Sequence, residues 1–122
     1  IIFTDEISAE NMPKVMSAIS LLIALPRYEG YGMTPLEALA SGTPFVGSKT
    51  GYFEEFSSHG KYGSVVELED VANAAKAVLH WLSKNDELDI FSEISRKYIL
   101  ENYSIEQEVN GINKAYLSLL KD

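Results

Sequence analysis

The sequence predicts an α/β fold in which helices flank a mainly parallel sheet. Short apolar runs alternate along the chain with segments whose apolar residues recur every three or four positions, which is typical of this class. The clearest apolar run is residues 21–25, which Pro26 ends and which are too few for a helix, as expected of a strand buried on both faces. The clearest helical segment is residues 105–119, whose apolar side chains form one stripe.

Strands are predicted where short apolar runs are bounded by glycine, proline or polar residues. They are residues 1–4, 21–25, 43–48 and 64–68. The third run follows Gly42 and the fourth follows Gly60 and Gly63, as expected of strands that are entered through turns.

Helices are predicted between and after these strands, at residues 11–20, 35–41, 53–58, 70–83, 89–101 and from residue 104 onwards. Asp70 and Ser104 stand at N-cap positions, and Gln107 follows Ser104 at the spacing of a capping box. In residues 70–83, the side chains expected to face the core are Val71, Ala75, Val78, Leu79 and Leu82. In the last helix, the expected apolar stripe is Ile105, Val109, Ile112, Tyr116 and Leu119.

The composition excludes several classes of function. The chain has 122 residues, which suits a single domain, and 46% of them are hydrophobic, which is too many for intrinsic disorder. Its net charge of −8 disfavours binding to nucleic acid or anionic lipid, since both require clustered positive charge. No run reaches the ~20 apolar residues of a membrane-spanning helix. The chain has no cysteine, and His59 and His80 lack ligand partners at metal spacing, so we expect no disulfide and no metal site.

Residues 26–37 carry the strongest indication of chemistry. There a predicted strand ends, a turn with Gly30 and Gly32 follows, and a helix begins, which is where open α/β sheets bind ligands. The two glycines permit positive φ angles and close approach to the backbone. The first amides of the helix lack partners within the helix, so together with the helix dipole they form an anion site suited to phosphate.

Two carboxylates flank this anion site, because Glu29 precedes the glycines and Glu37 lies within the helix. A phosphate would repel them, but a vicinal diol offers two hydroxyl donors at the spacing of carboxylate oxygens. A nucleotide sugar, with a diphosphate between two hydroxyl-bearing groups, fits both features. Two structural interpretations stay open: Thr34 and Glu37 also fit a capping box with Pro35 at the first helical position, and Glu29 also fits a solvated loop residue.

Residues 28–46 closely resemble the signature of the retaining family 4 glycosyltransferases, which are GT-B enzymes also called group 1. In this chain they run Tyr-Glu-Gly-Tyr-Gly-Met-Thr-Pro-Leu-Glu-Ala-Leu-Ala-Ser-Gly-Thr-Pro-Phe-Val, and Glu29 and Glu37 match the family's two glutamates separated by seven residues. Further segments that resemble the family are residues 3–5, 50–54, 60–66 and 103–106, so the resemblance covers essentially the whole chain. The departures from its pattern are Asp5 in place of glycine, Thr50 and Phe53 within a Gly-Gly-x-Pro-Glu loop, and Ile105 in place of an aromatic residue.

The resemblance implies a role for each residue of the loop. Glu29 corresponds to the family's first glutamate, which contacts hydroxyls of the transferred sugar, and Glu37 to the second, which holds the ribose diol of the nucleotide. The other implied donor-binding residues are Gly30, Tyr31, Gly32, Met33 and Thr34. Backbone amides of the last three would face the diphosphate, and the backbone of Tyr31 would lie near the donor sugar. The family transfers the sugar with retention and usually without a bound metal, so we expect neither a metal nor a cofactor.

The same resemblance implies that residues 1–122 are an incomplete C-terminal nucleotide-sugar-binding domain. In the family this domain begins with further strand–helix units, which supply an arginine and a lysine for the diphosphate, and an N-terminal acceptor domain precedes them. Residues 1–4 and 21–25 would be strands 3 and 4 of the order 3-2-1-4-5-6, and the strands between them are absent. Arg27 and Lys49 are the nearest cations in this chain, and we expect a solvated Arg27.

Expectations about activity and partners follow from this incompleteness. We expect the isolated chain to be inactive, and to self-associate through the open edge of residues 21–25 or through the last helix. The expected partners are a nucleotide sugar and, through the missing domain, a glycan or glycolipid acceptor. The expected location is the cytoplasm, including the inner face of the membrane, which the absence of cysteine also fits.

Other functions remain open at this point. Nucleotide-sugar epimerases and glucan or sucrose-phosphate synthases share the fold, and the missing acceptor part separates them from a transferase that builds a surface polysaccharide or glycolipid. A non-catalytic α/β module of the receiver or nucleotide-sensing type is a further alternative. A receiver needs an acidic cluster after its first strand and a lysine after a later one, and the sequence has no convincing pair of this kind.

Overall fold

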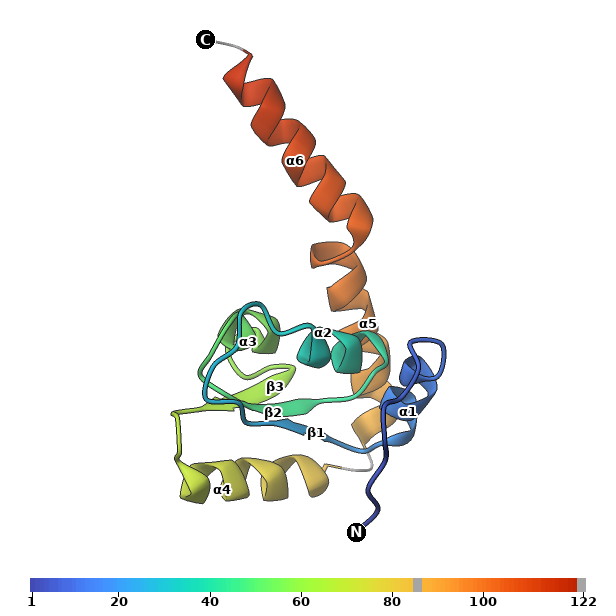
Figure 1. The fold of residues 1–122 in the computed structure, drawn as a ribbon, viewed down its shortest axis with the longest axis vertical. Helices are drawn as coiled ribbons and strands as arrows, with labels where there is room; N and C mark the ends of the chain where they lie inside the picture. The colour runs from blue at the N-terminus through green and yellow to red at the C-terminus, as the bar shows by residue number, and fades with distance from the viewer. Residues whose placement is uncertain (85–86, 121–122) are drawn as a thin grey trace.

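The computed structural model describes residues 1–84 and 87–120 and has the α/β architecture that the sequence predicts. Its sheet is parallel, with the order β1-β2-β3, and consists of β1 (Leu22–Ala24), β2 (Phe45–Ser48) and β3 (Gly63–Val66). Figure 1 shows α2 (Met33–Ala40) and α3 (Phe53–Ser57) on one face of this sheet and α4 (Val71–Leu82) on the other.

The central strand, β2, organises the core. All of its residues are buried, since it has a strand on either side and helices on both faces. The aromatic ring of Phe45 crosses to the neighbouring strand, where a Cβ atom at Gly63 would come within 2.6 Å of it. The core cluster consists of Leu36, Leu39, Phe45, Val46, Phe53, Phe56, Tyr62, Trp81, Phe91 and Ile99.

The strand β1 lies at an edge of the described sheet, as the sequence analysis expects of residues 21–25. The expectation that this strand is buried on both faces is wrong, because Ile23 is 53% exposed while Leu22 and Ala24 are half-buried. The reason is the position of α4, which packs against β2 and β3 and leaves one face of β1 uncovered.

The predicted strand at residues 1–4 is also wrong. This segment has no regular structure, and the side chains of Ile1, Ile2 and Phe3 are almost fully exposed. A strand exists only where a neighbour accepts and donates its backbone hydrogen bonds, and within the described residues no strand lies beside this segment. The helix predicted next is confirmed as α1 (Met12–Ala18), whose Met16 is buried.

The helix α4 is confirmed together with its cap, because Asp70 accepts a hydrogen bond of 3.0 Å from the backbone N–H of Asn73. Its predicted core face is wrong in part: Val71, Leu79 and Leu82 are 77%, 68% and 45% exposed. The side chain of Trp81, rather than these residues, determines which face of α4 is turned toward the sheet. Its indole is buried, and Nε1–H donates to Ser64 Oγ of β3 at 3.0 Å.

The chain ends in two long helices, α5 (Leu88–Asn102) and α6 (Ile105–Leu119). Residues Phe91, Ser95 and Ile99 of α5 are buried, and this helix packs against α2. Ser104 caps α6 as predicted, by accepting a hydrogen bond from the backbone N–H of Gln107. Figure 1 shows α6 extending away from the sheet, and none of its residues is buried, so its apolar stripe has no partner within the described chain.

Across the residues that the structure describes, no helix is both long and apolar enough to span a bilayer.

Candidate functional site

The loop between β1 and α2, residues 25–32, lies at the carboxyl ends of the strands. The loops after β2 and β3 reach the same edge, because the strands are parallel. This edge is therefore where the segment with Glu29 and Glu37 meets residues that are distant in the sequence.

The N-terminus of α2 begins earlier than the sequence predicts. Gly32 is the N-cap residue, with a left-handed conformation (φ 97°), and Met33 is the first helical residue. The structure contradicts one of the two structural interpretations left open above, the capping box of Thr34 and Glu37 with Pro35 at the first helical position. The left-handed glycine lets the chain enter the helix before Thr34, and Pro35 then falls in the first turn, where its missing N–H costs no helical hydrogen bond.

Among the described residues, no side chain caps the N-terminus of α2, which we call its mouth. Met33 and Thr34 there are exposed, whereas Gly32 is buried. Their amides, together with the amide of Gly32, stand at the positive end of the helix dipole. Gly32, Met33 and Thr34, whose amides are predicted to face a diphosphate, thus stand at the start of α2, and their role in binding stays a prediction.

The two glutamates have different surroundings. Glu29 is half-buried, and its Oε1 accepts a hydrogen bond of 2.9 Å from the N–H of Gly30. Its Cγ also lies 3.2 Å from the position that a Cβ atom would take at Gly51. Glu37 lies on the exposed face of α2, between the buried residues Leu36 and Ala38. Glu29 is therefore held by the loop, whereas Glu37 faces solvent one turn into the helix.

The loop after β2 supports the loop after β1, a contact that the sequence analysis missed. The backbone N–H of Tyr52 donates to the carbonyl of Tyr31 at 3.2 Å, and a Cβ atom at Gly51 would come 2.9 Å from the same carbonyl oxygen. The ring of Tyr31 lies 5.1 Å from that of Tyr52 and 5.3 Å from that of Phe56. The order of the predicted elements could have indicated this contact, since loops that follow adjacent parallel strands meet at one edge of a sheet.

The aromatic contacts continue from this loop into α5. The ring of Tyr103, just after α5, packs edge-on against Phe56 at 5.2 Å, and its hydroxyl lies 3.3 Å from that of Tyr98. Burial and the neighbouring Tyr98 hydroxyl raise the pKa of Tyr103, so its hydroxyl stays neutral. The loop with Tyr31 thus rests on a packed aromatic layer.

The nearest basic side chains are already paired. Arg27 Nη2 lies 2.9 Å from Glu69 Oε1, and Lys49 Nζ lies 3.1 Å from Glu67 Oε1. The hydrogen bond from Lys49 to Glu67, followed by the charge of Glu54, raises the pKa of Lys49. The expectation of an Arg27 exposed to solvent holds, since its side chain is 85% exposed, but it also has a carboxylate partner.

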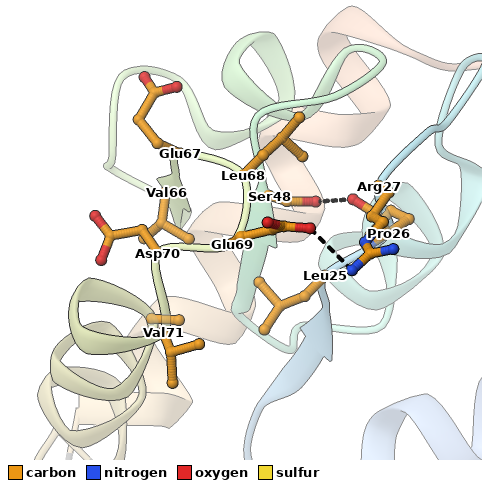
Figure 2. Close-up of a pocket in the computed structure, with 11 residues that line it drawn as sticks. Leu25, Pro26, Arg27, Ser48, Val66, Glu67, Leu68, Glu69, Asp70 and Val71 are labelled. Atoms are coloured by element: carbon orange, nitrogen blue, oxygen red, sulfur yellow. Dashed lines mark hydrogen bonds and ion pairs between the residues drawn. The ribbon is translucent and has the colours of Figure 1, made fainter.

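A hollow of about 170 Å³ lies beside the predicted site, on the side of α4. Figure 2 shows it at the carboxyl ends of the three strands, with Glu67, Glu69 and Asp70 around it. Ser48 Oγ–H donates to the carbonyl of Pro26 across its base. Neither Glu29 nor Glu37 lines this hollow, and its carboxylates would repel a phosphate, so we do not assign the diphosphate to it.

Among the described residues, no group of three or more His, Cys, Asp or Glu side chains is placed to hold a metal ion.

Comparisons with known proteins give the family. The model of the family described as "Glycosyl transferases group 1" matches residues 1–116. The lipopolysaccharide core biosynthesis mannosyltransferase LpsB of Rhizobium meliloti (strain 1021) is 32% identical over 113 residues, which is 91% of this chain and 32% of that protein. The corresponding enzyme LpcC of Rhizobium leguminosarum bv. viciae is 34% identical over 104 residues, which is 85% of this chain and 30% of that protein.

A further relative is the N-acetyl-alpha-D-glucosaminyl L-malate synthase of Bacillus anthracis, which is 26% identical over 113 residues, 93% of this chain and 30% of that protein. The chain thus spans about a third of the length of the curated relatives that it matches. Because the family model matches residues 1–116, almost the whole of its length, the chain belongs to the group 1 glycosyl transferases.

Proposed function

We propose that this chain is the donor-binding part of a glycosyltransferase that moves a sugar from a nucleotide sugar to a glycan or glycolipid acceptor, with retention of anomeric configuration. The observation that carries the proposal is the N-terminus of α2, where Gly32 has a left-handed conformation, no side-chain hydrogen bond caps the helix, and Glu29 and Glu37 lie before and after it in the sequence. Membership of the family supports the transferase class.

In this proposal the backbone binds the diphosphate and the side chains bind hydroxyls. The amides of Gly32, Met33 and Thr34 donate to the diphosphate, and the dipole of α2 stabilises the negative charge that develops on the leaving nucleotide. The donor itself carries the leaving group, so the proposal includes no cofactor and no metal.

The two glutamates act at opposite ends of the donor. Glu29, held against its own loop by the N–H of Gly30, accepts hydrogen bonds from hydroxyls of the transferred sugar. Glu37, exposed on α2, accepts hydrogen bonds from the two ribose hydroxyls. Bonds from neutral hydroxyls to a carboxylate are charge-assisted, and they compensate for placing carboxylates near a diphosphate.

The names of two relatives indicate the kind of product. LpsB and LpcC are both named as mannosyltransferases of lipopolysaccharide core biosynthesis. We propose that the whole protein likewise builds a surface polysaccharide or glycolipid in the cytoplasm, at the inner face of the membrane, and that its acceptor is bound by residues outside this chain.

The first prediction tests the roles of the two glutamates in the whole protein. Glu29→Gln removes the charge from bonds to the transferred sugar, so kcat/KM for the donor falls by about tenfold to a hundredfold. Glu37→Gln weakens binding of the ribose, so the donor KM rises by about tenfold. The measurement is sugar transfer from UDP-, GDP- and ADP-linked hexoses, with thermal unfolding of each variant as the check on folding.

The matched control is Glu93→Gln on α5, an exposed glutamate on another element. It should leave all kinetic parameters unchanged. Near-normal transfer by both site variants, with folding intact, would show that the two glutamates are merely structural and would remove the basis of the proposal.

A further inference from the structure

The ring of Phe53 lies between two glycines on different elements. Phe53 begins α3 and is only 1% exposed. A Cβ atom at Gly32 would overlap Cε1 of this ring and lie 2.8 Å from Cδ1, whereas a Cβ atom at Gly47 would overlap Cδ2 and lie 3.0 Å from Cε2. Opposite edges of one ring therefore touch the N-cap of α2 and the central strand β2, with no room for a methyl group on either side.

This contact links the sheet to the mouth of α2. Gly47 belongs to the central, fully buried strand, so one edge of the ring rests against a rigid surface. The other edge meets Gly32, whose left-handed conformation aims the amides of Met33 and Thr34. Tyr52, the residue before Phe53, holds the preceding carbonyl of Tyr31 by its backbone N–H at 3.2 Å.

In this chain residue 53 is phenylalanine, and its ring occupies the space between the two glycines.

We propose that Phe53 is a positioning residue for donor binding. Its ring packs against Gly47 on one edge and against Gly32 on the other, so it fixes the position of Gly32 and thereby the direction in which the backbone amides of Met33 and Thr34 point toward the diphosphate. This inference rests on the proposed function, and it assigns to Phe53 no contact with the donor.

The test uses the whole protein and displaces the ring of Phe53 from the edge that faces Gly47. Gly47→Ala adds a methyl group against the ring edge opposite Gly32, at a residue whose backbone needs no positive φ. The displaced ring should shift Gly32, so the dissociation constants of UDP, GDP and ADP and the donor KM rise by about five- to tenfold. Phe53→Leu makes room for the methyl group, so the double variant should bind the nucleoside diphosphates no more weakly than Phe53→Leu alone, and the two losses should not add.

Phe53→Leu by itself tests the same point if Gly47→Ala does not fold. It removes the ring that supports Gly32, so nucleoside diphosphate binding weakens by about three- to tenfold. The matched control is Phe91→Leu, the same change in another buried phenylalanine, whose ring packs on Trp81 and Tyr62. It should lower the unfolding temperature to a similar extent and leave nucleoside diphosphate binding unchanged.

The outcomes separate this inference from the proposed function. If the unaltered protein neither binds these nucleoside diphosphates nor transfers sugar, the proposed function and the inference fall together. If it does both, but Phe53→Leu binds as tightly as the unaltered protein, the inference alone is wrong. It is also wrong if Phe91→Leu weakens nucleoside diphosphate binding as much as Phe53→Leu does.

Discussion

Asp70 is the residue whose ionisation the structure ties most directly to stability. Its carboxylate accepts two hydrogen bonds from Asn73: 3.0 Å from the backbone N–H and 2.7 Å from the side-chain amide. The backbone hydrogen bond, followed by the side-chain one, lowers the pKa of Asp70 below its usual 3.8. The folded chain therefore prefers the ionised carboxylate, and protonation weakens the cap of α4.

The second prediction compares Asp70→Ala with Asp70→Asn. Asp70→Ala removes the oxygen that caps α4, so the unfolding temperature falls by a few degrees. Asp70→Asn keeps a capping oxygen, so its unfolding temperature stays close to that of the unaltered chain at neutral pH. The stability that ionisation adds is present above the unfolded pKa of 3.8 and is lost as the pH falls through the lower folded pKa. Calorimetry across this range should show the advantage over Asp70→Asn shrinking with acid, and a constant difference would contradict the assignment.

At the residue scale, the sequence predicts the hydrogen bonds of a side chain correctly when its partner is only a few positions away in the chain. Asp70 and Ser104 were found as caps because their partners lie three residues away. The alternative of Thr34 as a cap fails because α2 starts at the left-handed Gly32, and the ring of Phe53 that lies against Gly32 is too distant in the sequence for a local pattern to contain. The donor-binding roles of Glu29 and Glu37 remain predictions.

At the scale of elements, α6 and β1 have apolar surface that no other described element covers. None of the residues of α6 is buried, and its stripe leaves Ile105, Val109 and Ile112 between 49% and 80% exposed. The strand β1 has one neighbour, β2, in the described sheet and shows Ile23 to solvent. Unpaired strand edges and amphipathic helices bury their apolar surface against another chain when none is supplied within their own.

The third prediction is that the isolated chain self-associates at high concentration. Two variants separate the surfaces: deletion of residues 105–122 removes α6, and Ile23→Lys places a charge on β1. At least one of them should lower the mass measured by light scattering. The deletion should leave the unfolding temperature nearly unchanged, since α6 buries none of its side chains. A monomeric mass for the unaltered chain would contradict the prediction.

Periodicity predicts that a segment is helical better than it predicts which side of the helix is covered. The stripe of α6 matches its pattern, yet it faces solvent. In α4 the same reasoning chose Val71, Leu79 and Leu82, whereas the hydrogen bond of Trp81 to Ser64 and the bulk of the indole turn another side to the sheet. The contact that decides the rotation lies outside the helix.

At the scale of the whole molecule, charge limits what the chain does alone. Its net charge is −8, and the two basic side chains nearest the predicted site, Arg27 and Lys49, are paired with Glu69 and Glu67. A diphosphate carries negative charge that the amides of one helix N-terminus do not neutralise. If the chain binds a diphosphate as proposed, we expect further neutralising charge from residues outside these 122, since the chain spans about a third of the length of its curated relatives.

The fourth prediction follows: the isolated chain releases no nucleotide from UDP-, GDP- or ADP-linked hexoses. Its affinity for the corresponding nucleoside diphosphates should be at least tenfold lower than that of the whole protein, because the charge on the diphosphate is left uncompensated. Nucleotide release above the rate of a protein-free blank would contradict this prediction.

The fold class was predictable because strand and helix patterns alternate along the sequence. The elements β2, α2 and β3 form as predicted because the chain itself contains the elements that they pack against. Residues 1–4 show the limit. Their apolar sequence suits a strand, but a strand also needs a partner, and none of the described strands lies beside them.

Trp81 is the sole tryptophan of the chain, and its place gives the protein an internal optical reporter. The indole projects from α4 and is buried, with its Nε1–H donating to Ser64 Oγ of β3 and the ring of Phe91 of α5 5.4 Å away. Its fluorescence emission should shift to longer wavelength when water enters the core. The emission should not change when α6 alone unfolds or associates. Intrinsic fluorescence therefore follows the loss of the sheet and its helices without any label.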